Sequence, residues 1–385
     1  MDPLKIAFIT HAIGVGGAAI SSTTTIQNLI DTGLLKSEEC LIIHNKISQK
    51  TDKKKDLYFN LKKEIKFYEF KLPFSLVFKG ATSNGFTRVY HFVSDCVALL
   101  SFLLFYNKIL RQEKITTIHL NSLVLWPLLL VIPRSMQSVI HIREVPNTSM
   151  TSRIAIFVIN RYASKIIAID PISDIPFSKS GKSTVISNPF NMTNARQLRS
   201  SKNTIKSELG IPPEMFVVSI FGLIGEQKGF DFFLKVIQTA FPIKNLIFLV
   251  IGSPHGKTGE YYIHFFEKQT NVKYLGELIH PEKIHAITDV VIRCEDYLPL
   301  GRTVWEEIFA GGLALVPVNK NDDISVIQDY IGKYIFTYQA LNVDNCVEIL
   351  KKIMDHYPET VLDTGYPVTN NISTSAEQFF EVIKS

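Results

Sequence analysis

The stretch Leu298-Pro-Leu-Gly-Arg-Thr-Val-Trp-Glu-Glu-Ile-Phe-Ala-Gly-Gly312 indicates how the chain folds. An apolar run at residues 290–292 precedes it and predicts a strand of a buried parallel sheet. Residues 302–310 have helical spacing, the glycines at 311 and 312 end the helix, and residues 313–317 begin the next strand. A strand, a turn and a helix N-terminus in this order present free backbone N–H groups to an anion, typically a phosphate.

The polar side chains at the start of this predicted helix favour a binding site. An ordinary strand–helix–strand unit of any doubly wound protein has the same backbone geometry, so the geometry alone does not distinguish the two. Arg302, Thr303 and Glu306 lie within the first turn and a half. A cation, a hydroxyl and a carboxylate are therefore expected to converge on one ligand.

This stretch resembles the retaining glycosyltransferases of the GT-B fold, specifically family 4 (glycosyl transferases group 1). Members of that family commonly carry Glu-Pro-Phe-Gly-Arg-Thr-aliphatic-aliphatic-Glu-Ala-Met-Ala-x-Gly. The matching positions are Pro299, Gly301, Arg302, Thr303, Glu306, Ala310 and Gly311. The position of the first glutamate is Leu298. The resemblance implies an α/β fold with two doubly wound Rossmann-like domains facing across a cleft, and a C-terminal helix that crosses back to the first domain.

A glycine turn near the N-terminus is a second candidate phosphate site. Residues 5–10 predict a strand, and a helix is expected to follow the Gly-Gly-Ala turn at residues 16–18. Nicotinamide binding is disfavoured, because Ala19 replaces the third glycine of its fingerprint and no acidic residue closes the second strand. In the resembled family a similar turn lies beside the donor diphosphate, and Gly16 and Gly17 are the matching pair.

The second half contains further residues that match donor-binding positions of the family. Gly222, Lys228 and Gly229 are retained after the strand at 216–221, whereas the family's arginine is replaced by Leu223. Arg302, a planar double donor, is expected to compensate in part. Gly252, after the strand at 246–251, leaves room for a nucleotide base.

Two strand ends in the first half carry the candidate catalytic residues. His-Leu-Asn-Ser at 119–122 and His-Ile-Arg-Glu at 141–144 resemble segments of the family, and both are expected where ligands gather, at the carboxyl ends of parallel strands. The family's histidine near the sugar corresponds to either His141 or Arg143. Arg143 and Glu144 are the stronger candidates for a site, because His141 inside a strand is equally typical of a core histidine. We expect His119 to be structural.

Length and composition bound the domain organisation. At 385 residues, with 46% hydrophobic residues, the chain is long enough for two globular α/β domains. Asn188-Pro189 predicts a turn, and a comparable Asn-Pro lies at the interdomain hinge of GT-B enzymes. We therefore predict an acceptor-side domain at residues 1–187 with the helix 372–385, and a nucleotide-sugar-binding domain at residues 188–371.

Charge and cysteine content indicate the cellular setting. The net charge of +5 lies largely in local runs and does not imply nucleic-acid binding. Four widely spaced cysteines favour buried thiols in a reducing cytosol. No signal peptide is recognised, and the apolar stretches 97–106 and 123–132 are too short to span a bilayer. We expect a cytoplasmic protein, with peripheral contact at the inner face of the cytoplasmic membrane as one option.

Two segments bear on that membrane contact, and a third predicts an apolar core helix. The lysine-rich residues 48–66 are either a solvated surface or a basic patch for anionic headgroups, and residues 70–78 are a candidate apolar acceptor loop. Residues 93–109 predict a strongly apolar helix that lies mostly in the core.

The resemblance implies transfer of a sugar from a UDP- or GDP-sugar to a saccharide or lipid-linked acceptor, as in surface polysaccharide assembly. No cofactor is expected, and the absence of an Asp-x-Asp motif in this setting predicts metal-independent transfer by cations, amides and helix dipoles. Leu298 cannot bind the donor's hydroxyls as the family glutamate does. Glu295 or Asp296 takes that role, or the donor differs there, or activity is reduced. The last option keeps open a non-catalytic nucleotide-sugar-binding protein, and a sugar-nucleotide epimerase of the same fold is a weaker third class.

Overall fold

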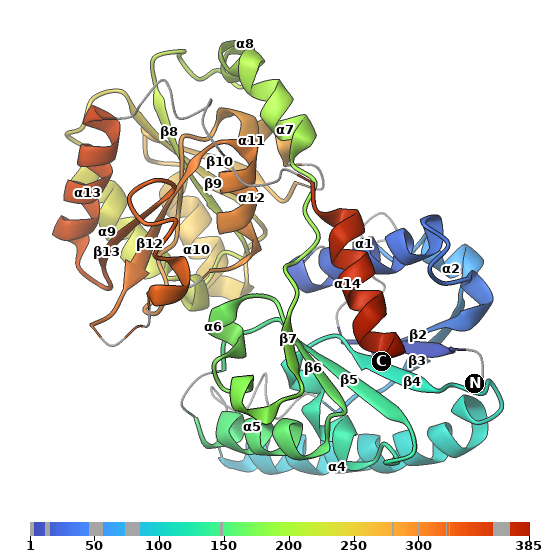
Figure 1. Ribbon diagram of the computed structural model, residues 1–385. Coiled ribbons are helices and arrows are strands. Elements are labelled where there is room, and N and C mark those ends of the chain that lie inside the picture. The colour runs from blue at the N-terminus through green and yellow to red at the C-terminus, as the bar shows by residue number, and fades with distance from the viewer. Residues whose placement is uncertain are drawn as a thin grey trace. The chain divides into compact units, whose positions relative to one another are not determined.

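The structure is a computed structural model that describes residues 4–11, 16–45, 57–73, 85–146, 149–278, 281–298, 300–320, 322, 324–356 and 370–385. The chain divides into two compact units (Figure 1). Unit 1 comprises Met1–Pro189 and Asn371–Ser385, and unit 2 comprises Phe190–Asn370. Each unit is a parallel sheet with helices on both faces, so the predicted α/β class with two doubly wound units is confirmed.

Unit 1 contains a seven-stranded parallel sheet in the order β3-β2-β1-β4-β5-β6-β7. Its strands are β1 (Ile6–Thr10), β2 (Cys40–Asn45), β3 (Lys66–Phe70), β4 (Thr117–Leu120), β5 (Gln137–Ile142), β6 (Lys165–Ala168) and β7 (Ser183–Val185). Its helical segments are α1 (Gly17–Asp31), η1 (Ser37–Glu39), α2 (Leu61–Glu64), α4 (Gly85–Phe105), the π-helical turn η3 (Tyr106–Leu110), η4 (Leu123–Leu130), α5 (Met150–Tyr162), α6 (Pro171–Asp174), η5 (Ser178–Ser180) and α14 (Ile372–Lys384).

The strands β1 and β2 of unit 1 are almost continuously apolar and buried because both faces of the sheet are covered there. Along β1, Ala7 and Ile9 pack in a core cluster with α4, η4 and α5. Ile6 and Phe8 pack in a second cluster on the other face, which includes Phe379 of α14. The last helix therefore belongs to unit 1, where it packs against α1 (Figure 1).

Unit 2 contains a six-stranded parallel sheet in the order β10-β9-β8-β11-β12-β13. Its strands are β8 (Phe216–Phe221), β9 (Leu246–Ile251), β10 (Val272–Gly276), β11 (Val290–Ile292), β12 (Leu313–Val318) and β13 (Ile335–Gln339). Its helical segments are α7 (Thr193–Leu198), η6 (Arg199–Ser201), α8 (Lys202–Glu208), η7 (Glu226–Lys228), α9 (Phe230–Ala240), α10 (Gly256–Phe266), α11 (Glu282–Ile287), α12 (Arg302–Ala310), η8 (Ser325–Ile327) and α13 (Val343–Asp355).

The order of strands in unit 2 reverses direction at β8 and β11, which are neighbours although three helices and two strands separate them in sequence. Ligands of doubly wound proteins bind outside the carboxyl ends of strands at such a reversal. The turn after β8 and the segment after β11 are therefore the part of unit 2 in which a ligand is expected.

The helix α4 differs from its prediction as a core helix. Its outer face is apolar and exposed, from 53% for Val97 to 72% for Leu104, so this part of the prediction is wrong. Among the described residues, Val89–Leu110 is one segment long and apolar enough to cross a membrane by length and composition. The predicted acceptor loop begins with Phe70, which packs against Phe102 and Phe105, and residues 74–78 lie outside the described residues.

Candidate functional site

The helix α12 begins as the sequence predicts, directly after Gly301. Gly301 is extended (φ −70°, ψ 170°), and no described side chain caps the helix. The helix α12 ends at Ala310 and is followed by Gly311, whose φ of 95° favours glycine. Pro299 lies outside the described residues. The first amides of α12 thus keep the anion-binding character of an uncapped helix N-terminus.

The polar side chains at the start of α12 are divided between two groups of contacts. The Arg302 Nε donates to Glu306 Oε1 at 2.6 Å, one helical turn on, and its guanidinium lies 4.7 Å from the ring centre of Phe190. The Thr303 hydroxyl instead accepts from Arg293 at 2.7 Å. Arg302 and Glu306 therefore form one pair, while Thr303 belongs to a second group centred on Arg293.

This second group contains two cations around one buried carboxylate. Arg293 directly follows β11, and its Nε donates to Glu295 Oε2 at 3.2 Å, with a second bond to Oε1. The Lys228 ammonium lies 3.3 Å from Glu295 Oε1. Arg293 and Glu295 are nearly completely buried, whereas the Lys228 side chain is 37% exposed. Lys228 is thus the most exposed member of the group.

Burial and charge act in opposite directions on these pKa values. Burial disfavours ionised Glu295, but the charges of Arg293 and Lys228 outweigh it and lower the pKa of its carboxyl. The pKa of Lys228 is lowered by burial and by repulsion from Arg293, against the attraction of Glu295. An anion that approached Lys228 would have to compete with Glu295 for this cation.

Gly222, Gly229 and Gly252 in this region have positive φ values, and a Cβ at either of the last two would meet neighbouring backbone. A Cβ at Gly229 would lie 1.7 Å from the carbonyl oxygen of Cys294, and one at Gly252 would lie 1.8 Å from that of Gly222. Gly229 therefore permits the turn that carries Lys228 to approach the end of β11. Gly222 and Gly252 permit the ends of β8 and β9 to lie close together, so the backbone accounts for these two glycines without a ligand.

A cavity of about 150 Å³ borders Lys228 on the side of α10. Its lining residues are Leu223, Gly225, Glu226, Gln227, Lys228, His255 and Thr258. Leu223, at the position of the family arginine, is 43% exposed and contributes an apolar wall. The cavity gives a ligand access to the Lys228 side chain from one side of the β8 turn.

The residues around Leu298 show which acids remain accessible. Leu298 and Leu300 are buried, each 5% exposed, so the position of the family's first glutamate is part of the packing of unit 2. Of the two acids suggested as substitutes, Glu295 is held by Arg293 and Lys228, and Asp296 has an exposed side chain.

In unit 1, Arg143 follows β5 and connects three segments. Its Nε donates to Asn121 Oδ1 and its Nη1 to Asn188 Oδ1, both at 2.7 Å. The Asn121 amide donates in turn to the carbonyl oxygen of Ala18 at 3.3 Å, in the first turn of α1. Arg143 is therefore fixed at the carboxyl edge of the sheet, next to the helix that starts at Gly17.

The glycine turn before α1 is partly described. Gly16 is extended (φ −160°, ψ 153°), and α1 starts at Gly17 without a side-chain cap. Both glycines are exposed. Residues 12–15 lie outside the described residues, so the first part of the predicted phosphate turn does too.

The histidines near Arg143 are held neutral. His141 and His119 are buried, 3.4 Å apart between Nδ1 and Nε2, and both rings contact Phe379. Burial and the charge of Arg143 lower the pKa of His119 to about 3, and they lower that of His141 well below its usual value. The same two causes lower the pKa of His11, at the end of β1, to about 4. These imidazoles therefore act as neutral groups near pH 7.

The Glu144 carboxylate binds the residues at the start of η4. Its carboxylate accepts from the Ser122 hydroxyl at 2.6 Å and from the Leu123 amide at 3.2 Å. Burial raises the pKa of Glu144, and these hydrogen bonds and Arg143 oppose the rise. The contacts give Glu144 a positioning role for η4, within the group that also contains Arg143.

No site role was predicted for His11 or Arg293, and Asn121 and Asn188 were named only as parts of a strand-end segment and of the interdomain turn. Each directly follows a strand or lies within a few residues of its carboxyl end. That position is a general indication of a ligand site in parallel sheets. Among the described residues, no cluster of three or more His, Cys, Asp or Glu side chains has the arrangement of a metal site.

The fold has counterparts among solved structures. No family model and no curated protein matches the sequence. The structure of Anabaena HepE in complex with UDP matches with a TM-score of 0.68 and 18% identity, over 99% of this chain and 97% of HepE. HepE in complex with UDP-glucose matches with a TM-score of 0.65, 17% identity and the same coverage. Sucrose-phosphate synthase from Thermosynechococcus elongatus matches with a TM-score of 0.68 and 13% identity, over 99% of this chain and 96% of that one. At these identities the likeness shows the fold, which is the GT-B fold of glycosyltransferases.

Proposed function

We propose that this chain is a retaining glycosyltransferase of family 4, which moves a hexosyl group from a UDP- or GDP-sugar to a saccharide or lipid-linked acceptor. The observation that carries the proposal is the group formed by Lys228, Arg293 and Thr303 beside the uncapped start of α12. It lies at the strand-order reversal of a GT-B unit, and similar structures hold UDP and UDP-glucose. Donor binding at this position would follow from charge and topology together.

In this proposal the diphosphate is bound by Lys228, Arg293 and the amides at Gly301–Thr303. Charge-assisted hydrogen bonds from an ammonium and a guanidinium suit phosphate oxygens. Gly16 and Gly17 stay proposed donor-binding residues on the ground of the sequence resemblance alone. Arg293 takes the role of the second cation, for which the sequence suggested Arg302. Arg302 instead orients Glu306, which accepts hydrogen bonds from the ribose.

The chemistry requires a leaving group that gathers negative charge. As the bond from the anomeric carbon to the diphosphate oxygen breaks, fixed cations and helix amides stabilise the charge, and we propose that no metal ion is needed. The acceptor hydroxyl oxygen bonds to the anomeric carbon with retention of its configuration, and the hydroxyl proton passes to the departing diphosphate. Arg143, positioned by Asn121 and Asn188, and neutral His141 are the proposed groups near the sugar and acceptor, with Glu144 fixing the adjacent segment.

The proposed setting is the cytoplasm, at the inner face of the cytoplasmic membrane, in assembly of a surface polysaccharide. A lipid-linked acceptor is consistent with the exposed apolar face of α4 in unit 1. No nucleic-acid partner is proposed.

The experiment that tests the function is a donor screen. Purified protein is exposed to UDP-, GDP- and dTDP-sugars, with binding measured by thermal shift and products by mass spectrometry in the presence of saccharide acceptors. We expect one nucleotide sugar to stabilise the protein and to be hydrolysed slowly or transferred. If no nucleotide sugar binds, the proposed function is refuted.

A catalytically impaired nucleotide-sugar-binding protein is the second candidate. Leu298 is buried and Leu223 forms an apolar cavity wall, at two positions where the family has polar donor contacts. Binding of a donor without hydrolysis or transfer to any acceptor would favour this candidate. Transfer at a rate above that of an Arg143→Ala variant would favour the enzyme.

A further inference from the structure

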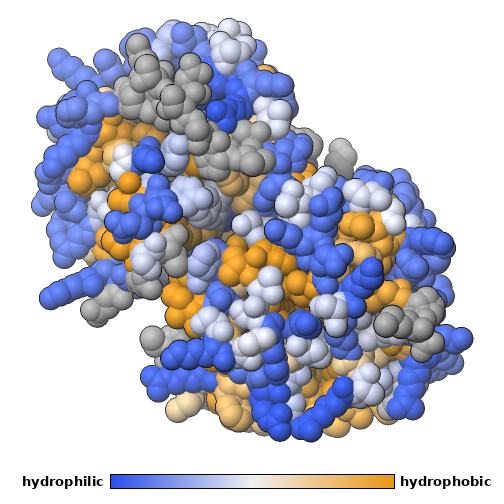
Figure 2. Space-filling view, in the orientation of Figure 1, coloured by the Kyte–Doolittle hydropathy of each residue, from blue (hydrophilic) through white to orange (hydrophobic). Residues whose placement is uncertain are grey.

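The outer face of α4 carries a continuous apolar stripe. Val89, Val93, Val97, Leu100 and Leu104 recur at spacings of three and four residues and are 53–72% exposed. Figure 2 shows hydrophobic side chains among hydrophilic ones along the lower edge of unit 1, where α4 lies in Figure 1. A surface helix of a soluble unit would normally be polar on this face.

A second stripe runs along α5. Met150, Ile154 and Phe157 follow the same spacing and are 46–71% exposed. The inner faces of α4 and α5 belong to one core cluster, and η4 contacts both helices, so the two stripes lie on the same side of unit 1 (Figure 1). Leu130 of η4, 49% exposed, adds to this face. We call the outer surface of α4, α5 and η4 the apolar face.

The apolar face belongs to helices that lie on the sheet. The inner side of α4 and η3 is anchored in the core cluster by Phe102 and Leu110, both fully buried. Insertion of Val89–Leu110 across a bilayer would remove these side chains from that cluster. A helix held by one face and apolar on the other suits contact in the plane of an interface.

Charge on this face is one-sided. Between Val89 and Phe105, α4 has one acidic residue, Asp95, and its side chain is buried. The helix α5 contains no acidic residue. The stripe of α5 continues to Arg161, and that of α4 continues to Lys108 and Arg111, all of them exposed. The helices α4 and α5 each lead from the carboxyl edge of the parallel sheet back to the start of another strand. The cations at their C-terminal ends therefore lie at the amino edge of the sheet.

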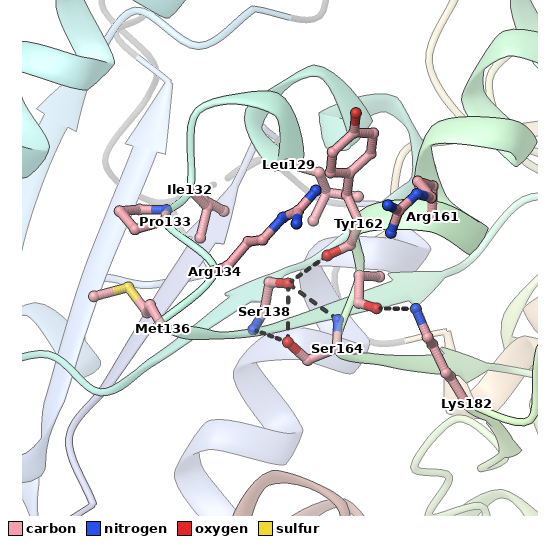
Figure 3. Close-up of a pocket in the computed structure, with 11 residues that line it drawn as sticks. Leu129, Ile132, Pro133, Arg134, Met136, Ser138, Arg161, Tyr162, Ser164 and Lys182 are labelled. Atoms are coloured by element: carbon pink, nitrogen blue, oxygen red, sulfur yellow. Dashed lines mark hydrogen bonds between the residues drawn. The ribbon is translucent and has the colours of Figure 1, made fainter.

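A basic cavity of about 250 Å³ lies at that edge (Figure 3). Its charged lining residues are Arg134, Arg161 and Lys182, and no acidic residue lines it. Lys182 donates to the carbonyl oxygens of Asn160 and Ala163, at 3.1 and 3.0 Å, and so caps the end of α5. The described residues give Arg134 and Arg161 no carboxylate partner, and both are exposed. The cavity thus offers two guanidinium groups to an anion at the end of the apolar face.

We infer that the apolar face of α4, η4 and α5 docks in the interfacial region of a bilayer that contains anionic phospholipid, with Arg134 and Arg161 binding a lipid phosphate at its edge. Apolar area and cations of one sign together are what such a surface recognises. The inference makes the membrane contact of the proposed function specific, and rests on it. It moves that contact away from the lysine-rich residues 48–66, which were the sequence-based candidate.

The test is co-sedimentation of the full chain with vesicles. One preparation contains phosphatidylcholine only, and in the other about a third of the lipid is phosphatidylglycerol. We expect binding to the anionic vesicles that weakens in high salt. A Leu100→Gln/Leu104→Gln/Phe157→Gln variant should bind at least about tenfold more weakly. An Arg134→Gln/Arg161→Gln variant should lose about thirtyfold on anionic vesicles and little on neutral ones.

Matched controls keep the outcomes distinct. A Phe241→Gln/Tyr261→Gln variant removes two comparably exposed aromatic side chains from unit 2 and should bind like the unaltered chain. Circular dichroism and thermal melting verify that each variant folds. Absence of binding to anionic vesicles, or full binding by the triple variant, would overturn the inference. So would a dimer in sedimentation equilibrium that the triple variant dissociates, because the face would then join two copies. Thermal shift with nucleotide sugars, measured on the same preparations, reports separately on the proposed function.

Discussion

An arginine follows a central strand in each unit, yet the two have different surroundings. Arg143, after β5, donates to the neutral amide oxygens of Asn121 and Asn188. Arg293, after β11, donates to the Glu295 carboxylate and the Thr303 hydroxyl. The carboxyl edges of the two doubly wound sheets therefore carry an arginine fixed by dipoles in unit 1 and one fixed by a counter-charge in unit 2.

The difference extends to the neighbouring titratable groups. Near Arg143, buried histidines are held neutral, and near Arg293 a buried glutamate is held ionised. An anion that approaches Lys228 and Arg293 has to compete with Glu295, whereas amides around Arg143 present no competing charge. We expect the contacts of unit 2 to rearrange most on donor binding. We expect the stability of unit 1 to depend most on acid pH.

The largest expected effect is at Lys228. A Lys228→Ala variant should weaken binding of the donor about a hundredfold, because a charge-assisted contact to a phosphate is worth about 1.5–3 kcal/mol and Arg293 alone remains. Isothermal titration with the nucleotide sugar found in the donor screen measures the change. Lys235→Ala, an exposed lysine of α9, is the control. Equal affinities of the two variants would remove Lys228 from the site.

A smaller effect is expected from Arg143→Lys, which retains the charge and removes the fork that spans Asn121 and Asn188. The transfer rate should fall about thirtyfold, with the affinity for UDP or GDP changed less than about threefold. Steady-state kinetics and titration of the free nucleotide separate the two quantities. A loss of nucleotide affinity as large as the loss of rate would show that Arg143 binds the nucleotide and would contradict this assignment.

Acidification should destabilise the chain through its neutral histidines. Their folded pKa values lie below the ordinary value of 6.5, at about 4 for His11 and about 3 for His119, so the unfolded chain binds protons first as the pH falls. Stability is retained above about pH 6.5 and lost below it, by about 1.4 kcal/mol per pH unit for each histidine.

Urea denaturation between pH 7 and pH 5 measures this slope. His119→Gln removes one proton-binding group and should give a shallower decline than the unaltered chain, which separates the histidine contribution from that of the carboxylates. Parallel declines in both proteins would contradict the assignment.

The smallest effect concerns Glu295. Glu295→Gln removes the carboxylate that competes for Lys228 and Arg293, so inorganic pyrophosphate should bind about three- to fivefold more tightly. Titration with pyrophosphate and with the nucleotide sugar compares the two ligands. If Glu295 contacts the sugar instead, the nucleotide sugar will bind more weakly while pyrophosphate binding is unaffected. Glu208→Gln, an exposed glutamate of unit 2, is the control.

Much of the fold followed from local patterns in the sequence. Glycines and apolar runs located β1 with α1, and β11 with α12 and β12, because a parallel sheet covered on both faces needs continuous apolar strands. The helix α4 was mispredicted as core, because its composition is apolar on all sides and composition does not show which face the sheet covers.

The candidate site was only partly predictable. Lys228, Thr303 and Arg143 stand beside recognisable glycines or strand ends, and the structure places them in polar groups. Arg293 was overlooked, since its bond to Thr303 joins residues that are ten positions apart in the sequence. Spacing along the chain indicated that Arg302, Thr303 and Glu306 would converge, but the rotamers direct Arg302 to Glu306 and Thr303 to Arg293.

Phe379 has a consequence for how the protein is made. Its ring lies 5.0 Å from that of His119 and 6.2 Å from that of Phe8, although more than 250 residues separate it from both strands along the chain. During translation, β1 and β4 leave the ribosome long before α14 is synthesised. The ribosome must synthesise all of unit 2 before Phe379 can pack on the sheet of unit 1. The core of unit 1 is therefore completed last, although its synthesis begins first.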